Sequence, residues 1–344
     1  MPYPGRVDQE EKTTVPLLCY NKYSTNQIMK TETILITGAN GQIGTVLGQA
    51  LREKFGADRV IATDIREPEL RHFPFEALDV LDRAALFELV ERRRVTQIYH
   101  LAAILSAKGE LNPQWAWEVN MSGLFNVLEA AREYGCKVFN PSSIAVYGGE
   151  TPKINTPQHA VLQPQTVYGI SKVAGEHWSH YFHAKHGVDI RAVRYPGIVG
   201  YQSMPGGGTT DYAVDIFHHA VRGEPYTCFL APDARLPMMY MADAVRATIE
   251  IMEAPAEEVK IRTAYNIAGM NFTPAEITAA IQAEVPGFET AYKPDFRQKI
   301  AESWPENIDD TPAREDWGWQ PAYDLQSMTK DMLLHLREME SAVL

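Results

Sequence analysis

Short apolar runs alternate with helical stretches from about residue 31 to residue 193. This alternation is typical of β-α-β units, whose strands form one parallel sheet with helices on both faces. The expected strands are 33–37, 59–63, 97–101, 137–140 and 189–193, and the expected helices are 42–55, 83–91, 113–134 and 167–185. The pattern predicts an α/β fold with a Rossmann-type doubly wound parallel sheet.

The sequence pattern changes after Tyr195, where frequent glycine and proline residues indicate loops. A chain of 344 residues can bury one large core or two unequal ones. We therefore expect a Rossmann domain over residues 31–198 and a smaller α/β substrate-binding domain, mainly over 199–344, with some segments returning to the first sheet. Residues 1–30 lack the apolar core of a secretory signal and are expected to be a leader or an appended segment.

Composition narrows the possible partners. The net charge is -12, and no stripe of lysine and arginine with interleaved aromatics is present, so we expect no nucleic-acid partner. No apolar stretch approaches the roughly 18 residues of a membrane span, so no membrane partner is expected either. The three cysteines, Cys19, Cys136 and Cys228, lie far apart and form no C-x-x-C pair, which favours a reduced, cytoplasmic setting.

Residues 34–44 read as a strand, a glycine-rich turn and the start of a helix. Glycines in such a turn allow positive φ, close approach of a pyrophosphate and tight packing of helix on strand. The pyrophosphate would then lie at the positive end of the helix dipole. The motif is weak by itself, because any tight turn between a strand and a helix can be rich in glycine.

Asp64 strengthens the case for a dinucleotide site, because it ends the next expected strand, twenty positions after Gly44. At that place a carboxylate binds the ribose 2′-hydroxyl of NAD and repels the 2′-phosphate of NADP. Arg66 keeps NADP open, since a guanidinium two residues on is able to accept that phosphate. We expect NAD as the cofactor.

Two Tyr-x-x-x-Lys pairs, Tyr168/Lys172 and Tyr181/Lys185, mark candidate catalytic residues. This spacing places both side chains on one helix face, where the ammonium lowers the pKa of the phenol and makes it a general base. The two pairs are about 140° apart on one helix, so only one can face the cofactor. Tyr168/Lys172 is favoured because it follows the small polar loop at 141–148, which includes Ser143.

With these pieces in place, the chain resembles the extended short-chain dehydrogenase/reductases, the family that includes UDP-galactose 4-epimerase. The resemblance rests on the glycine turn, Asp64, His100-Leu101-Ala102-Ala103, the Ser-Ser-x-x-Val-Tyr-Gly loop, Tyr168/Lys172, Arg194-Tyr195-Pro196 and Trp317-Gly318-Trp319-Gln320-Pro321. It implies that Ser143 hydrogen-bonds the reacting oxygen, that Asp79 and Val80 lie by the adenine, and that Tyr195 to Ile198 contact the nicotinamide half.

The cofactor-binding residues expected from motif and resemblance together are Gly38, Asn40, Gly41, Gln42, Ile43, Gly44, Asp64, Ile65, Arg66, Asp79, Val80, Leu101, Ala102, Ala103, Asn120, Tyr168, Lys172, Tyr195, Pro196 and Ile198. The expected catalytic residues are Tyr168, Ser143 and Lys172.

Within that family, residues 205–213, 235–240 and 301–305 resemble the short-chain-type L-threonine 3-dehydrogenases. The resemblance implies oxidation of L-threonine at the β-hydroxyl to 2-amino-3-oxobutanoate, a step of threonine catabolism, with NAD and without a metal. Three successive glycines offer backbone N–H groups to a carboxylate. The expected substrate-binding residues are Ser106, Ser143, Tyr168, Gly207, Gly208, Thr209, Thr210 and Trp304.

Two other functions remain possible from the sequence. A sugar-nucleotide epimerase or dehydratase shares this fold but needs contacts for two phosphates and a uracil, for which the segment after Gly200 shows few candidates beyond Arg222 and Arg235. A non-enzymatic NAD sensor would have no reason to keep Ser143, Tyr168 and Lys172 together.

Assembly and metal binding are judged from the helices. In resembling enzymes, the helices that correspond to 113–134 and 167–185 pair across a two-fold axis, so we expect a homodimer. Four histidines recur at every third residue from His177 to His186, a stripe that drifts around the helix by about 60° at each step. We therefore expect a solvated or interface helix there and no metal site.

Overall fold

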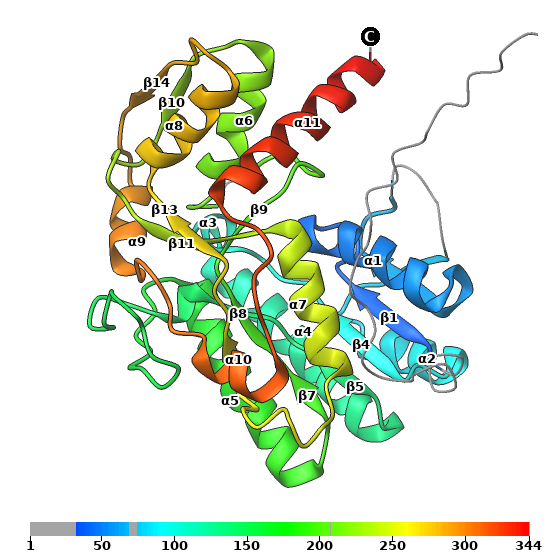
Figure 1. Ribbon diagram of the computed structural model, residues 1–344. Coiled ribbons are helices and arrows are strands. Elements are labelled where there is room, and N and C mark those ends of the chain that lie inside the picture. The colour runs from blue at the N-terminus through cyan, green and yellow to red at the C-terminus, as the bar shows by residue number, and fades with distance from the viewer. Residues whose placement is uncertain (1–31, 69–73, 207, 344) are drawn as a thin grey trace, which may run out of the picture. The chain divides into compact units, whose positions relative to one another are not determined.

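A six-stranded parallel sheet in the order β3-β2-β1-β4-β5-β7 is the frame of the fold (Figure 1). The chain builds outward from β1 in one direction and then in the other, which is the doubly wound order and confirms the predicted fold class. The strands are β1 (Ile34–Thr37), β2 (Val60–Asp64), β3 (Phe75–Ala77), β4 (Gln97–His100), β5 (Lys137–Phe139) and β7 (Ile190–Arg191). The sequence patterns missed β3, an edge strand in which two residues are partly buried and the third is exposed.

The computed structural model describes residues 32–68, 74–206 and 208–343. The expected leader at 1–30 and the predicted substrate residue Gly207 lie outside the described residues. The described residues from Glu32 onward form one compact unit. Among the residues described, no helix is long and apolar enough to cross a membrane.

Helices cover both faces of the sheet, so the side chains that alternate between the two faces of each strand are buried on both. Leu35, Ile61 and Ile98 pack under α2 and α4, while Ile34 and Ile36 pack with α1 and α7 in a separate core. The helices are α1 (Gln42–Phe55), α2 (Arg83–Arg93), α3 (Ser106–Leu111), α4 (Pro113–Tyr134), α5 (Val167–His186) and α7 (Met241–Glu253).

The ends of the two longest helices of this part follow local rules. The Asn112 side chain accepts a hydrogen bond from the N–H of Trp115 ahead of α4, and the Thr166 side chain accepts one from Gly169 ahead of α5. Gly135 and Gly187 end these helices with φ of 72° and 70°. These signals explain why the expected bounds of α4 and α5 agree with the structure to within one residue.

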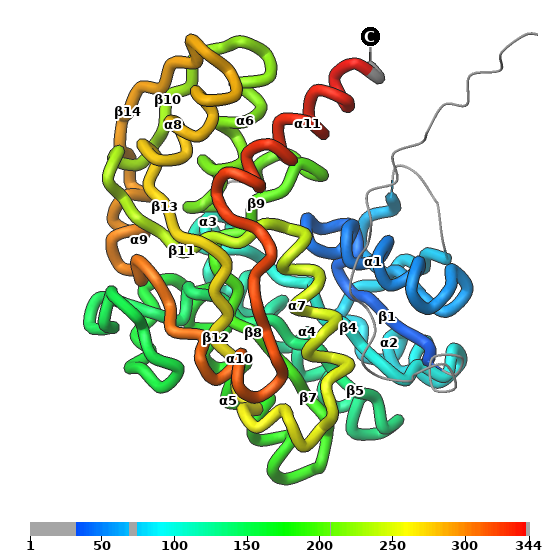
Figure 2. Tube along the Cα trace, viewed as in Figure 1, coloured from blue at the N-terminus to red at the C-terminus, as the bar shows by residue number. Residues whose placement is uncertain are grey.

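The second part of the fold surrounds another core, in which buried residues of α6, α8 and α11 meet. The expected strand 189–193 is wrong as one element: it divides into β7, in the main sheet, and β8, which pairs with β6 and β12 instead. Figure 2 labels β7, β8 and β12 along the chain trace. The remaining elements are β6 (Ser142–Ser143), β8 (Val193–Tyr195), β9 (Gly197–Val199), α6 (Tyr212–Arg222), β10 (Tyr226–Cys228), β11 (Leu236–Tyr240), β12 (Tyr265–Asn266), β13 (Met270–Phe272), α8 (Pro274–Glu284), β14 (Thr290–Tyr292), α9 (Arg297–Ser303), α10 (Thr311–Trp317), α11 (Leu325–Val343) and the 3₁₀ turns η1 (Ala57–Arg59) and η2 (Ile144–Val146).

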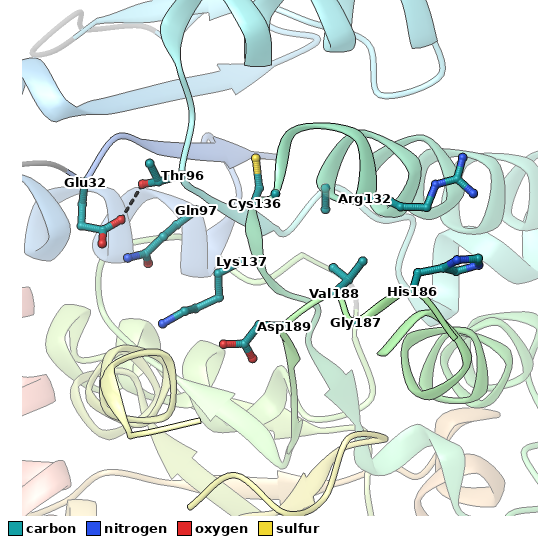
Figure 3. A pocket seen from close by; sticks show the side chains of 12 residues that line it. Glu32, Thr96, Gln97, Arg132, Cys136, Lys137, His186, Gly187, Val188 and Asp189 are labelled. Carbon is teal, nitrogen blue, oxygen red and sulfur yellow. Dashed lines mark hydrogen bonds between the residues drawn. The ribbon is translucent and has the colours of Figure 1, made fainter. Parts of the chain in front are cut away.

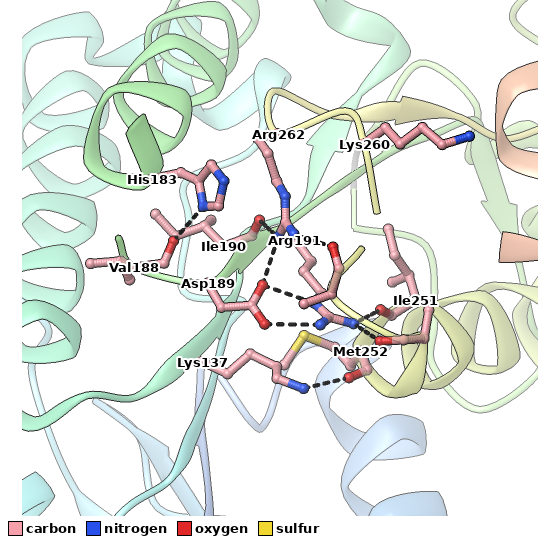
Figure 4. Close-up of polar contacts among 12 residues, drawn as sticks. Lys137, His183, Val188, Asp189, Ile190, Arg191, Ile251, Met252, Lys260 and Arg262 are labelled. Atoms are coloured by element: carbon pink, nitrogen blue, oxygen red, sulfur yellow. Dashed lines mark hydrogen bonds and ion pairs between the residues drawn. The ribbon is translucent and has the colours of Figure 1, made fainter. Parts of the chain in front are cut away.

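The amino-terminal ends of the parallel strands form one edge of the main sheet, where a cavity of about 420 Å³ opens beside Glu32, Gln97 and Lys137 (Figure 3). The helix before each of these strands ends here, so unpaired carbonyl groups gather at this edge. Cations satisfy those at the end of α7: Lys137 donates to the Met252 carbonyl, and buried Arg191 donates to the carbonyls of Ile251 and Ala254 (Figure 4).

Asp189 holds two arginines at this edge, with N–O distances of 2.8 Å to Arg191 and 2.6 Å to Arg262 (Figure 4). Burial opposes ionisation of Asp189, but the hydrogen bonds and charges of the two guanidinium groups outweigh it and lower the pKa of the carboxyl to about 2. The charged groups at this edge thus form ion pairs with one another and donate hydrogen bonds to the carbonyl groups at the end of α7.

Candidate active site

The carboxyl-terminal edge of the sheet brings Ser143 and helix α5 together. Ser143 belongs to β6, which the sequence treated as loop and which pairs in parallel with β8. Helix α5 passes so close to the turn after Ser143 that a Cβ atom on Gly169 would lie 2.2 Å from the Ala145 carbonyl oxygen. Glycine in the first turn of α5 therefore allows Tyr168 to reach the serine.

The three expected catalytic side chains meet at this place. The Tyr168 phenol hydrogen-bonds Ser143, the Lys172 Nζ lies 5.5 Å from the centre of the Tyr168 ring, and that ammonium donates to the Pro141 carbonyl at 2.7 Å. All three side chains are partly accessible. A phenol, a hydroxyl and an ammonium arranged in this way can accept and pass on the proton of a substrate alcohol.

The protonation of these groups differs from the expectation. Burial raises the pKa of Tyr168 to about 12, although the hydrogen bond with Ser143 lowers it in part. Burial also lowers the pKa of Lys172 to about 8, against the attraction of Glu176. The expected lowering of the phenol pKa is thus wrong in direction, because loss of water outweighs the hydrogen bond with Ser143.

The second Tyr-x-x-x-Lys pair lies on another face of α5. Tyr181 is 44% exposed and packs edge-on against Trp178 and Phe182. Lys185 is exposed at the last turn of the helix. Neither side chain belongs to the group around Ser143.

The glycine turn after β1 forms a cradle with no room for side chains. Gly38 has a φ of 70°, and a Cβ atom there would lie 2.6 Å from the Ala102 nitrogen. A Cβ atom on Gly44 would lie 2.5 Å from the Gly38 carbonyl oxygen. Gly41 precedes α1 without any side-chain cap, so the first N–H groups of the helix stay available to a phosphate.

Asp64 completes this cradle at the end of β2. Its two carboxylate oxygens accept hydrogen bonds from the backbone nitrogens of Asn40 and Arg66, both at 3.1 Å. Arg66 points largely into solvent, with its Nε 3.9 Å from Asp64. An oriented carboxylate beside a glycine turn fits the ribose of NAD.

A family model described as the NAD-dependent epimerase/dehydratase family matches residues 34–268, which include the cradle and the Ser143, Tyr168 and Lys172 group. The chain belongs to this family. The membership confirms both the resemblance to extended short-chain dehydrogenase/reductases and NAD as the cofactor.

The chain is also similar to individual proteins of known sequence or structure. An uncharacterised epimerase/dehydratase of Staphylococcus haemolyticus is 49% identical over 314 residues, which are 90% of this chain and 99% of that protein. The solved GalE-like L-threonine dehydrogenase of Cupriavidus necator, in its holo form, is 58% identical with a TM-score of 0.87, over 88% of this chain and 99% of that one. A solved L-threonine 3-dehydrogenase from a metagenome, described as monomeric, is 48% identical with a TM-score of 0.87, over 89% and 99% of the two chains.

Several of the cofactor residues expected in this family member lie along the same sheet edge. Asn120 of α4 holds the loop after β4 through the backbone of Ile104, and it donates to Ser171 of α5. Val80 is buried against Gly123, whereas Asp79 is exposed. The remaining expected residues of the glycine turn and of the ends of β2 and β4 are Gln42, Ile43, Ile65, Leu101, Ala102 and Ala103.

Tyr195 is placed differently from its neighbours. Its ring lies in the core between the sheet and α7, where its hydroxyl hydrogen-bonds Thr248. Only the backbone at Tyr195 remains able to face the cofactor, while Pro196 and Ile198 continue into β9. The resemblance could not show this, because a motif names a residue without the direction of its side chain.

The expected substrate residues that the structure describes lie in the 208–210 loop, at the start of α3 and beside the turn after Ser143. Thr210 packs on Gly197, where a Cβ atom would lie 2.6 Å from the threonine methyl carbon, so the 208–210 loop lies beside the 195–198 segment that is expected to contact the nicotinamide half. Ser106 is buried at the start of α3, and Thr209 is buried too. Trp304 is 8% exposed and packs in the same core as the turn after Ser143.

Sequence reasoning missed Glu176 and gave its partner Arg194 no role beyond the family resemblance; both are buried behind the catalytic group. Helical periodicity was the signal that could have found Glu176, because it lies one turn after Lys172. The 420 Å³ cavity lies at the opposite sheet edge from this chemistry. In the described part of the chain, no group of three histidine, cysteine or acidic residues is arranged to hold a metal ion.

Proposed function

We propose that the protein oxidises L-threonine at its β-hydroxyl to 2-amino-3-oxobutanoate with NAD. The observation that carries this proposal is the 58% identity with the L-threonine dehydrogenase of Cupriavidus necator over nearly the whole of both chains. The Ser143, Tyr168 and Lys172 group supplies the polar side chains that oxidation of a secondary alcohol requires.

The chain's own residues divide the work of the reaction. Ser143 binds the alcohol oxygen and orients it toward Tyr168, which takes the hydroxyl proton as a phenolate. Lys172 favours that phenolate by its positive charge and holds the ribose. The glycine turn and Asp64 would hold NAD, which would supply the acceptor for the hydride of C3.

The loop before α6 is proposed to hold the amino-acid end of the substrate. One of its N–H groups is already used, because Gly208 donates to the Asp211 carboxylate at 2.7 Å. We therefore assign substrate contacts to Thr209 and Thr210 rather than to an open row of glycine N–H groups. Trp304 would support the pocket from the core side.

The contacts of two arginines count against a sugar-nucleotide substrate. Arg235 pairs with Glu276 at 2.5 Å, and Arg222 pairs with Glu340 at 3.3 Å. The two cations that the sequence offered to a diphosphate are thus already engaged. A cytoplasmic location is proposed as well, consistent with Cys136 and Cys228, which are buried and unpaired.

A substrate panel tests the proposed function. L-threonine, L-serine, D-threonine and UDP-galactose are each offered with NAD or NADP, while the reduced cofactor is followed by absorbance and UDP-glucose by chromatography. We expect reduced cofactor with L-threonine and NAD. Conversion of UDP-galactose to UDP-glucose without turnover of threonine would reverse the assignment.

A further inference from the structure

Glu176 is a buried acid of α5 to which the proposed reaction gives no role. It lies one turn after Lys172 and two turns after Tyr168, so the three side chains follow one face of the helix. Its side chain is only 2% exposed. A carboxylate removed from water in this way needs strong partners.

Glu176 finds these partners on the strands that carry the catalytic serine. Ser142 donates to Oε1 at 2.5 Å, and Arg194 donates at 2.9 Å to Oε1 and at 2.7 Å to Oε2. Ser142 and Arg194 are opposite one another in the β6–β8 ladder. One carboxylate therefore ties α5 to the strand in which Ser143 follows Ser142.

The far side of Arg194 is equally well held. Its Nη1 donates to the Tyr147 hydroxyl at 3.1 Å, to the Gln158 carbonyl at 3.0 Å and to Asn266 Oδ1 at 3.1 Å. The Tyr147 hydroxyl itself donates to Asn266 at 2.5 Å. The guanidinium of Arg194 is thus held in place by its hydrogen bonds, and its two bonds to Glu176 hold that carboxylate in place in turn.

The groups that face Lys172 are Tyr168 and Glu176 from its own helix and His100 from β4, with Arg194 of β8 behind Glu176. His100, Ser142, Lys172 and Glu176 line one small enclosed cavity. Burial and the charge of Lys172 lower the pKa of His100, so that imidazole stays neutral. Within the Glu176–Arg194 pair, the negative charge of Glu176 raises the pKa of Lys172.

We propose that Glu176 is a positioning residue of the active site. Its carboxylate fixes the Ser142–Ser143 strand against α5 and places a negative charge one turn from the ammonium of Lys172. The proposal rests on the proposed function of Ser143, Tyr168 and Lys172. Packing alone would require neither the charge nor the shared hydrogen bonds.

The following variants distinguish the effect of the Glu176 charge from an effect on folding. E176Q alone would leave Arg194 buried without a counter-charge, so E176Q is combined with R194Q, which removes both charges. E176D keeps the charge but draws it back by one methylene group. D243N is the matched control, because Asp243 is a buried carboxylate of α7 that pairs with Arg246 at 2.7 Å.

The decisive measurement is the titration of Lys172 by NMR in protein labelled with ¹³C-lysine, its signal assigned by loss in K172R. We expect Lys172 to titrate about one pH unit lower in E176Q/R194Q than in the parent, because the favourable charge is gone. E176D should titrate between these two, and D243N should match the parent. The measurement uses no substrate, so it holds whether or not threonine is the substrate.

Turnover provides the second readout. Above about pH 8, turnover in E176Q/R194Q should fall about tenfold for each unit by which the pKa of Lys172 is lowered, because a smaller share of the protein then combines an ammonium with a phenolate. Equal titration of Lys172 in the parent and in E176Q/R194Q, or an equal shift in D243N, would overturn the proposal. If E176Q/R194Q does not fold, E176D decides the matter: unchanged titration and unchanged turnover would refute the role.

Discussion

At the scale of single residues, the active site depends on how burial changes the charge of two neighbouring groups. Burial raises the pKa of Tyr168 to about 12 and lowers that of Lys172 to about 8. Both shifts have the same cause, because surroundings poor in water disfavour the phenolate and the ammonium alike. The reactive form has a Tyr168 phenolate beside a Lys172 ammonium. It therefore depends on both groups together and on Ser143.

Replacing Tyr168 by phenylalanine tests the general base. Tyr168→Phe deletes the proton acceptor but keeps the ring, so turnover with threonine should fall about 10²- to 10⁴-fold while NAD affinity changes little. Tyr181→Phe is the matched control, since it shares the Tyr-x-x-x-Lys spacing on an exposed face of α5 and should keep near-parental turnover. Steady-state kinetics and NAD titration measure both. An inactive Tyr181→Phe beside an active Tyr168→Phe would rule out the mechanism.

The pH profile follows from the order of the two pKa values. The competent form has Tyr168 deprotonated and Lys172 protonated, and the phenol has the higher pKa. That form gains population as pH rises until Lys172 begins to lose its proton, near pH 8, and then stays level. We expect kcat/KM for threonine to rise to about pH 8 and to level off above it. A profile that is flat below pH 8 would contradict this protonation scheme.

At the scale of elements, the parallel strands divide their work between two edges. The carboxyl ends present the glycine turn, Ser143 and Asp64, whereas the amino ends gather the ends of helices and the residues that cap them. Arg191 is only 1% exposed and shares Asp189 with Arg262. This edge contributes stability, and the opposite edge contributes chemistry.

Asp189→Asn should lower the free energy of unfolding by about 2 kcal/mol at neutral pH, because the native pKa lies below its ordinary value. A lowered native pKa gives stability that is full above the ordinary value of 3.8 and is lost as pH falls through about 2. The difference between parent and variant should therefore shrink over that interval. Urea unfolding at several pH values measures it.

Glu129→Gln is the control for this prediction, since Glu129 forms an exposed ion pair with Arg132 on α4. It should cost less than about 1 kcal/mol. Both variants should keep the turnover of the parent. A loss of stability in Asp189→Asn that is constant from neutral pH down to the acid limb would argue against this origin.

At the scale of the whole molecule, α4 and α5 pack against each other. Several of their aromatic side chains are exposed. Trp178 is 37% exposed, and its ring centre lies 4.6 Å from that of Phe125 and 5.4 Å from that of Tyr181. Ile170, on the same helix, is 48% exposed. Exposed apolar side chains of this size are typical of an interface.

We propose that this α4–α5 face joins two copies of the chain, so light scattering should give the mass of a homodimer. Trp178→Glu should shift the mass toward the monomer, because a carboxylate in the interface would lose its water. Circular dichroism checks that the variant stays folded. A monomer mass for the parent at working concentration would disprove the dimer, and one solved relative is described as monomeric.

Local sequence signals determined much of the frame and of the site. The glycine turn, Asp64 and the Ser143, Tyr168 and Lys172 group were predicted, as were the bounds of α1 and α4, because turns, caps and periodicity depend on residues close in sequence. The division of the 189–193 strand and the strand β3 were not predicted.

Tertiary structure alone decided the direction and charge of key side chains. Tyr195 turns its ring into the core, and the phenol pKa of Tyr168 rises instead of falling. Arg194 contacts Tyr147 and Asn266, which are 47 and 72 positions away in the chain. Burial and partners of this kind arise only when distant segments pack together, and they determine whether a group keeps its charge.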